Sequence, residues 1–93
     1  MGAADVIAQK LTAAFAPAEL SIADESGMHT GHAGSRPGGE THFNVRIVSS
    51  VFEGLSRVER QRRVYAALSD QLESQIHALS LTTLTPAEAW NER

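Results

Sequence analysis

ETHFNVRIVSSVFEGLSRVERQRRVYAALSDQLESQIHALSLTTLTPAEAW, residues 40–90, is the stretch that decides the fold. It opens on a strict apolar and polar alternation, which predicts a strand over His42 to Ser50. Near its end, a run rich in leucine and β-branched residues predicts a second strand over Ile76 to Leu84. One face of the first strand is expected to carry Phe43, Val45 and Ile47.

Two helix starts are marked in the same stretch. Ser56 and Glu59 fit a capping box, in which each side chain binds a backbone amide of the other residue, and they predict a helix from about Arg57 to Glu73. The segment Thr85 to Glu88 repeats this pattern, with Pro86 at the first helical position, and predicts a short helix that ends near Trp90. The apolar stripe of the long helix is expected to comprise Val58, Val64, Tyr65, Leu68 and Leu72.

Upstream, Ile7, Leu11 and Phe15 recur every four residues and predict a helix over Ala3 to Ala16 that Pro17 ends. The alternating segment Glu19 to Asp24 predicts a short strand that pairs antiparallel with the strand after His42. The resulting order, α-β-β-α-β-α, predicts one α+β domain over residues 1–93, with a small three-stranded sheet and helices packed on one face.

Between the first two predicted strands lies ESGMHTGHAGSRPGG, residues 25–39, which holds five of the seven glycines and two histidines. A loop of this length in so small a domain is usually either functional or disordered. The composition predicts a flexible, glycine- and histidine-rich loop.

Composition excludes several classes of function. The chain has no cysteine, so soft-metal binding has to use histidine or sulfur from a partner. A net charge of −3 disfavours a general polyanion binder, and no apolar run is long enough to span a membrane. No nucleophile motif, phosphate loop or convincing carboxylate pair is present, so no enzyme activity and no small-molecule substrate are expected. The expected compartment is the cytoplasm, or an organelle matrix if a targeting segment was removed.

Four histidines remain as candidate ligands. His77 shares parity with Leu79 and Leu81 at the start of a strand, so it is either a hydrogen-bonded histidine at the rim of the core or a metal ligand there. His29 and His32 are either solvated loop residues or an arm that folds onto that rim. His42 is interpreted as structural. Two imidazoles are too few to close a tetrahedral metal site, so further ligands would have to come from elsewhere.

The chain resembles the BolA family, whose topology is related to the type II KH domain. The resemblance is carried by ESGMH and ETHF, by Phe52, Gly54 and Ser56, by the region Arg60 to Tyr65, and by HALSL with the TP that follows. It covers essentially the whole chain from Glu25 onward.

The resemblance implies a partner and a cofactor. In the family, the histidine that matches His77 ligates a [2Fe–2S] cluster shared with a monothiol glutaredoxin, and a cysteine or histidine of the loop supplies the second ligand. This chain resembles the histidine subgroup, with His29 favoured over His32. The glutaredoxin cysteine and glutathione would supply the remaining thiolates. The free chain is expected to be a cluster-free monomer that acts, with its partner, in iron–sulfur cluster assembly, trafficking or iron regulation.

A basic segment supports the alternative. Members of the family have been described as DNA-binding transcription regulators of morphology and stress response. Four arginines could follow a phosphate backbone; the alternative is a solvated helix face, and Glu53, Glu59 and Asp70 dilute the basic charge. Gln61 stands where the family usually has histidine, so any role of that histidine is absent here. The predicted nucleic-acid residues are Arg57, Arg60, Arg62 and Arg63.

Overall fold

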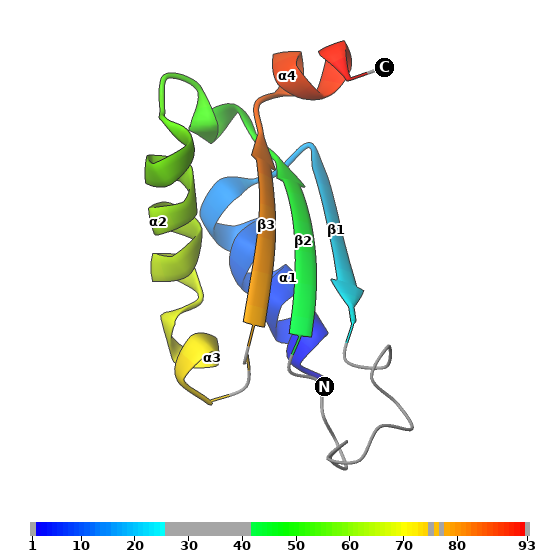
Figure 1. The fold of residues 1–93 in the computed structure, drawn as a ribbon, viewed down its shortest axis with the longest axis vertical. Helices are drawn as coiled ribbons and strands as arrows, with labels where there is room; N and C mark the ends of the chain where they lie inside the picture. The colour runs from blue at the N-terminus through cyan, green and yellow to red at the C-terminus, as the bar shows by residue number, and fades with distance from the viewer. Residues whose placement is uncertain (1, 26–41, 75, 77, 93) are drawn as a thin grey trace.

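The computed structural model describes residues 2–25, 42–74, 76 and 78–92. Four α-helices, three strands and one short 3₁₀ turn are formed within this part of the chain (Figure 1). In chain order they are α1 (Ala3–Phe15), β1 (Glu19–Asp24), β2 (His42–Val48), η2 (Ser50–Phe52), α2 (Arg57–Ala67), α3 (Ser69–Ser74), β3 (Ala78–Leu84) and α4 (Pro86–Asn91). The α+β class and the predicted order of elements are confirmed.

The three strands form a mixed sheet with β2 in the centre. β1 pairs antiparallel with β2, as predicted, and Glu19 lies opposite Val48. β3 pairs parallel with β2, with His42 opposite Ala78 and Val48 opposite Leu84. A parallel pair needs a crossover connection, and α2 and α3 supply it.

The core lies between one face of the sheet and the helices (Figure 1). The predicted stripe of α1 is buried, with Ile7 and Leu11 fully inside. The alternation of β2 places Phe43, Val45 and Ile47 on the same side, against α1 and α2. Each such side chain contributes about 1.5–3 kcal/mol through burial of its apolar surface, which is what holds so small a sheet to its helices.

The predicted long helix is interrupted. It ends at Ala67 and resumes as α3 at Ser69, because the Leu68 N–H is shared between the carbonyls of Val64 and Tyr65 and leaves the regular helical geometry. No proline or glycine marks this break, so periodicity alone does not reveal it. Two strands are shorter than predicted. β2 ends at Val48 instead of Ser50, and β3 starts at Ala78 instead of Ile76.

Part of the predicted stripe of α2 is wrong. Val58 and Tyr65 are 57% and 39% exposed, whereas Val64 and Leu68 are fully buried. Arg60 stands four residues before Val64 on the same helix and therefore shares its inward face. The buried stripe of the helix thus begins with an arginine.

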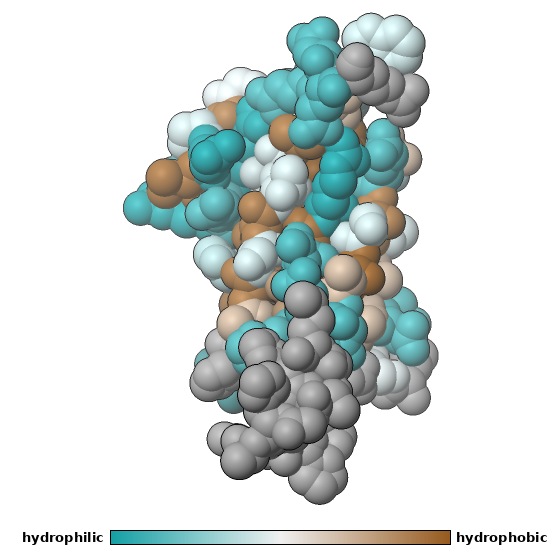
Figure 2. All heavy atoms as spheres, turned by 45° about the vertical axis from the view of Figure 1, so that its right-hand side comes forward, coloured by the Kyte–Doolittle hydropathy of each residue, from teal (hydrophilic) through white to brown (hydrophobic). Residues whose placement is uncertain are grey.

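The opposite face of the sheet carries polar residues in register. Ser21, Arg46 and Thr82 form one row across the three strands. Arg46 donates to Glu19 on β1 and to Glu92 just after α4, so it ties the last helix to this side of the sheet. An ion pair therefore holds the end of α4 to the polar face of the sheet, whereas α1 and α2 contribute buried apolar residues to the core on the other face. Hydrophilic side chains cover much of the upper part of the surface in Figure 2, with apolar side chains between them.

Residues just after β2 connect the sheet to α1. Ser49 is buried, and its hydroxyl donates to the Phe15 carbonyl at the end of α1 while it accepts from the Val51 N–H. Phe15 in turn packs against Phe52, with ring centroids 5.2 Å apart.

None of the described helices has the length and apolar character that crossing a membrane requires.

Candidate functional site

The three predicted metal ligands, His29, His32 and His77, lie outside the described residues, as does the predicted loop apart from Glu25. The residues that border them are described. Glu25 continues the ladder, because its N–H donates to the His42 carbonyl at 2.8 Å. The described residues on either side of the predicted ligands therefore show where the chain enters and leaves the predicted site.

These segments meet at one end of the sheet. Asp24, the last residue of β1, lies opposite Phe43, and His42, the first residue of β2, lies opposite Ala78. The end of β1, which precedes residues 26–41, the start of β2, which follows them, and the start of β3 therefore all lie at the same end of the sheet (Figure 1). Parallel pairing of β2 with β3 is what brings residues 42 and 78, which are far apart in sequence, into one row.

The described residues do not form a metal site by themselves. No group of three or more histidine, aspartate or glutamate side chains converges among them. The whole chain has no cysteine, so its own share of an iron–sulfur site is limited to imidazole or carboxylate. One or two histidines do not complete a four-coordinate metal site, so the remaining ligands would have to come from other groups.

His42 is described and lies close to this edge. It is half-buried and alternates with Phe43 and Val45, so it stands on the polar face with Asn44 and Arg46, as predicted. Residue 77 has the parity of Leu79 and Leu81, which pack against the core on the other face. The strand alternation therefore separates His42 from the face that is predicted for His77.

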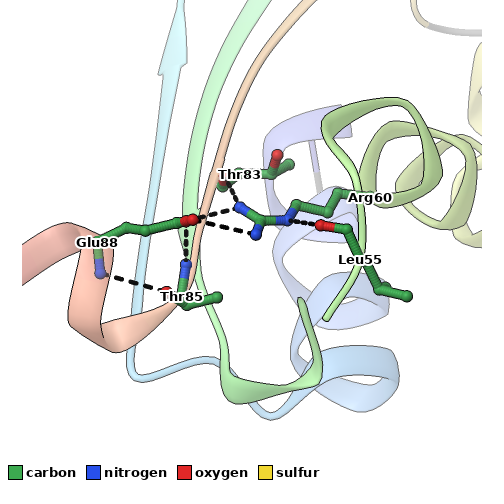
Figure 3. Close-up of polar contacts among 5 residues, drawn as sticks. All are labelled: Leu55, Arg60, Thr83, Thr85 and Glu88. Carbon is green, nitrogen blue, oxygen red and sulfur yellow. Dashed lines mark hydrogen bonds and ion pairs between the residues drawn. The ribbon is translucent and has the colours of Figure 1, made fainter. Parts of the chain in front are cut away.

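A second candidate, the basic segment, contains one arginine with a structural role. The Arg60 side chain is only 12% exposed. Its guanidinium donates to the carbonyls of Leu55 and Thr83 and forms a two-point ion pair with Glu88 (Figure 3). It also lies 6.0 Å from the centre of the Phe52 ring. Arg60 thus joins α2, β3 and α4, and contact with phosphate would require these bonds to break.

The partner of Arg60 is held on both sides. Glu88 accepts from the Thr85 N–H, and the Thr85 hydroxyl accepts from the Glu88 N–H, which completes the predicted capping box of α4. The Arg60 hydrogen bonds, followed by the Thr85 N–H, lower the pKa of the Glu88 carboxyl from 4.5 to about 2. Glu88 is therefore an anion under all ordinary conditions.

Acid should remove this contribution to stability. Because the pKa of Glu88 is lowered on folding, its contribution is complete above the unfolded pKa of 4.5 and is lost as the pH falls toward about 2. We expect the difference in unfolding free energy between wild type and Glu88→Gln to be constant above about pH 5 and to approach zero near about pH 2. Urea denaturation of both proteins across this range measures it, and a difference independent of pH would contradict the assignment.

The other arginines of the segment are exposed. Arg62 pairs with Glu59 at 3.1 Å on the surface of α2. Within the described part of the chain, Arg57 and Arg63 have no ion pair. Val58 and Tyr65 lie on the same helix and are partly exposed beside them. The predicted nucleic-acid surface is therefore reduced to three arginines.

Sequence reasoning missed the role of Arg60 because its acidic partner is 28 residues away. One local signal was present: Arg60, Val64 and Leu68 are spaced by four residues, which places the arginine on the buried side of α2. An arginine on a buried face requires a partner, and a capping-box glutamate at the neighbouring helix start was a candidate.

The mixed three-stranded sheet and its helices place the chain among small α+β domains, and comparison with known proteins gives the family. The family model described as BolA-like protein matches residues 11–88. The chain belongs to the BolA-like family.

Known proteins agree with this assignment. BolA-like protein 1 of Bos taurus is 50% identical over 86 residues, which covers 92% of this chain and 60% of the relative. SufE-like protein 1, chloroplastic/mitochondrial, of Arabidopsis thaliana is 49% identical and covered over 23% of its length. The solved structure of BolA1 from Arabidopsis thaliana superposes with a TM-score of 0.85 at 46% identity, with 95% of this chain and 96% of that one covered.

A bacterial relative, the DNA-binding transcriptional regulator BolA of Haemophilus influenzae, is 39% identical over 88 residues, which covers 95% of this chain and 82% of the relative. The chain spans 60% or less of the length of the bovine and plant relatives.

Proposed function

We propose that this BolA-like protein binds a monothiol glutaredoxin and shares a [2Fe–2S] cluster with it through His77 and a histidine of the loop, His29 or His32. The complex would act in iron–sulfur cluster assembly or trafficking, or in iron regulation. The proposal includes no enzyme activity of the chain itself. The cytoplasm and an organelle matrix both remain proposed locations, and the plant relative described as chloroplastic/mitochondrial supports the second.

One observation carries the proposal: the segment with His29 and His32 and the residue before Ala78 are joined to the same end of the sheet. Histidines that are 45 and 48 residues apart in sequence would otherwise have no reason to share a metal. The absence of cysteine explains why a thiolate-bearing partner is needed. The family model places the chain in the BolA-like family, and the resemblance to that family implies the same partner class.

Histidine ligation sets the properties of such a centre. When neutral imidazole replaces thiolate on iron, the negative charge of the cluster falls and its reduction potential rises. Imidazole binds metal only when it is unprotonated, so the shared cluster is held most firmly above the pKa of free histidine, about 6.5. The chain's role is to offer these two rings from one sheet edge, while the partner supplies the sulfur ligands.

Coexpression with the monothiol glutaredoxin of the same source tests the proposal. We expect a brown complex that elutes as a one-to-one heterodimer and whose visible absorption and circular dichroism differ from those of the glutaredoxin alone. If the two proteins do not copurify, or if the spectrum is that of the glutaredoxin homodimer, the proposal fails. The decisive variant, at His77, is considered in the Discussion.

A second function, DNA binding, is favoured by the exposed arginines of α2 and by the bacterial relative described as a DNA-binding transcriptional regulator. The pairing of Arg60 with Glu88 changes how it should be tested. Charge reversal at Arg60 would perturb the fold, so the test has to use the three surface arginines.

The triple variant of Arg57, Arg62 and Arg63 to glutamate should abolish a gel shift at about 0.15 M salt if these residues contact phosphate, since each phosphate contact contributes roughly one unit to the salt dependence of binding. Thermal denaturation checks that the variant is folded. A shift that is retained by the triple variant, or that occurs only at very low salt, would remove this function.

A further inference from the structure

The outer edge of β1, called here the β1 edge, is one of the two borders of the sheet (Figure 1). Within the described part of the chain, no strand pairs with it. The ladder shows which backbone groups of β1 face this edge. Glu25 continues the register of β1 with β2, and its N–H donates to the His42 carbonyl at 2.8 Å.

The bonding direction alternates from residue to residue along an antiparallel ladder. Every second residue counted back from Glu25 therefore bonds to β2, and the residues between them face outward. Leu20 and Ile22 are two of these, so the N–H and C=O groups of both point toward the β1 edge. Such outward groups are a template for pairing with another strand.

The border formed by β3 is closed in a way that the β1 edge is not. The Ser49 N–H donates to the Leu84 carbonyl, so Leu84 faces β2 and Thr83 faces outward. The carbonyl of Thr83 accepts from the guanidinium of Arg60 at 3.1 Å, and α2 contacts β3 along this border (Figure 1). A strand added to β3 would have to displace a largely buried arginine, which directs strand addition to β1 instead.

Apolar side chains accompany the outward backbone groups of β1. Leu20 and Ile22 pack against the core but are only partly buried, and they alternate with exposed residues. Figure 2, which brings this side of the molecule forward, shows apolar surface between hydrophilic side chains. A strand beside β1 would place every second side chain next to Leu20 and Ile22 and would cover their remaining apolar surface.

The charge of this strand selects the partner. Residues 19–25 contain three acids, Glu19, Asp24 and Glu25, and no lysine or arginine. A second copy of the chain, paired through the same edge by two-fold symmetry, would set these acids along both strands, and like charges across a ladder are destabilising. A segment that carries lysine or arginine at its ends complements the edge.

We propose that the β1 edge is a docking site for an extended basic segment of another protein, which pairs antiparallel with Glu19–Asp24 and adds a strand to the sheet. The backbone of Leu20 and Ile22 binds the segment, its apolar residues lie beside these two side chains, and its basic residues lie near Glu19 and Glu25. Addition of a strand to a free sheet edge is a recurrent mode of peptide recognition. The site uses none of the predicted metal ligands and goes beyond the proposed function.

Hydrogen exchange of the wild-type protein tests the inference. The probe is the peptide Lys-Val-Ser-Val-Ser-Val-Lys, acetylated and amidated at its ends, and amide exchange with water is measured by nuclear magnetic resonance. We expect the amides of Leu20 and Ile22 to exchange fast in the free protein. They should slow roughly tenfold when about nine tenths of the protein is bound, because exchange then occurs from the unbound fraction. The outward amides of Leu79 and Leu81 on β3 should be unchanged.

Two modified peptides distinguish a backbone ladder from attraction between charges. In the antiparallel pairing, the valines face β1 with their amides and the serines face away. N-methylation of the three valines should abolish the protection, whereas N-methylation of the two serines should preserve it. Glu25→Lys should weaken binding of the unmodified peptide roughly three- to tenfold, because a cross-strand attraction becomes a repulsion. Glu53→Lys makes the same change of charge at an exposed residue before α2 and is the matched control.

Four outcomes would overturn the inference. The first is unchanged exchange of Leu20 and Ile22 at about 1 mM peptide, and the second is an equal effect of the two modified peptides. The third is slow exchange of these amides in the free protein at every concentration, which would mean that the chain itself covers the edge. The fourth is protection that rises with protein concentration without peptide, which would assign the edge to a second copy.

Discussion

Replacement of His77 by alanine is expected to abolish the cluster shared with a monothiol glutaredoxin. The chain has no cysteine, so no thiolate of its own can replace the imidazole as an iron ligand. Loss of a residue that only hydrogen-bonds to a metal ligand lowers metal affinity roughly 10- to 100-fold, and loss of the ligand itself should lower it further. The iron and acid-labile sulfide content of the copurified complex, with its visible circular dichroism, measures the effect.

His42→Ala provides the matched control. His42 lies at the same end of the sheet, but on the polar face with Asn44 and Arg46. We expect this variant to retain the cluster and the heterodimer spectrum. A His77→Ala complex with unchanged spectrum and iron content would refute ligation by His77 and, with it, the proposed function.

The loop histidines are distinguished by the same measurement. His29→Ala and His32→Ala are expected to differ, because only one of them is needed to complete the chain's share of the site. The family resemblance favours His29. If both single variants keep the cluster and only the double variant loses it, each histidine can serve.

Replacement of Arg60 by alanine is expected to lower the free energy of unfolding by about 2–3 kcal/mol, although Arg60 is one of the predicted nucleic-acid residues. The variant leaves the carbonyls of Leu55 and Thr83 without their donor and Glu88 without its counter-ion. Hydrogen bonds to charged groups contribute about 1.5–3 kcal/mol each, and the partial exposure of Glu88 reduces the share of the ion pair. For a domain of this size, the melting temperature should fall by roughly 8–24 °C.

Arg62→Ala is the control, because it removes an arginine side chain from the same helix, two residues after Arg60. Its ion pair with Glu59 is exposed on the helix surface, so the loss should be below about 0.5 kcal/mol. Glu88→Gln should lower the free energy of unfolding by part of the amount that Arg60→Ala does. The double variant should lower it by less than the sum of the two single variants, because the two residues are in direct contact. Equal stabilities of Arg60→Ala and Arg62→Ala would contradict a structural role for Arg60.

Local chemistry was sufficient for much of the fold. Helix α1 follows from the four-residue recurrence of Ile7, Leu11 and Phe15, and β1 was predicted with the same bounds that the structure has. The start of α4 follows from Thr85, Pro86 and Glu88, because a capping box involves atoms only three residues apart. These features depend on neighbours along the chain, so the sequence determines them without a tertiary structure.

Other features exist only in the folded chain. The break at Leu68 and the exposure of Val58 and Tyr65 depend on how α2 is set against the sheet, which local periodicity does not encode. The antiparallel pairing of β1 with β2 and the parallel pairing of β2 with β3 together bring Glu25, His42 and Ala78 to one end of the sheet.

The sequence by itself limits the candidate soft-metal ligands of this chain to histidine, because the chain has histidine and no cysteine. It also determined which segments form strands and helices. Only the tertiary structure decided that Arg60 is bound by Glu88 across 28 residues, and that the oxygen of Gln71 is buried without a described partner. The physical reason is the same in both cases: whether a polar side chain is free or bound depends on which distant groups share its desolvated surroundings, and chain folding alone brings those groups together.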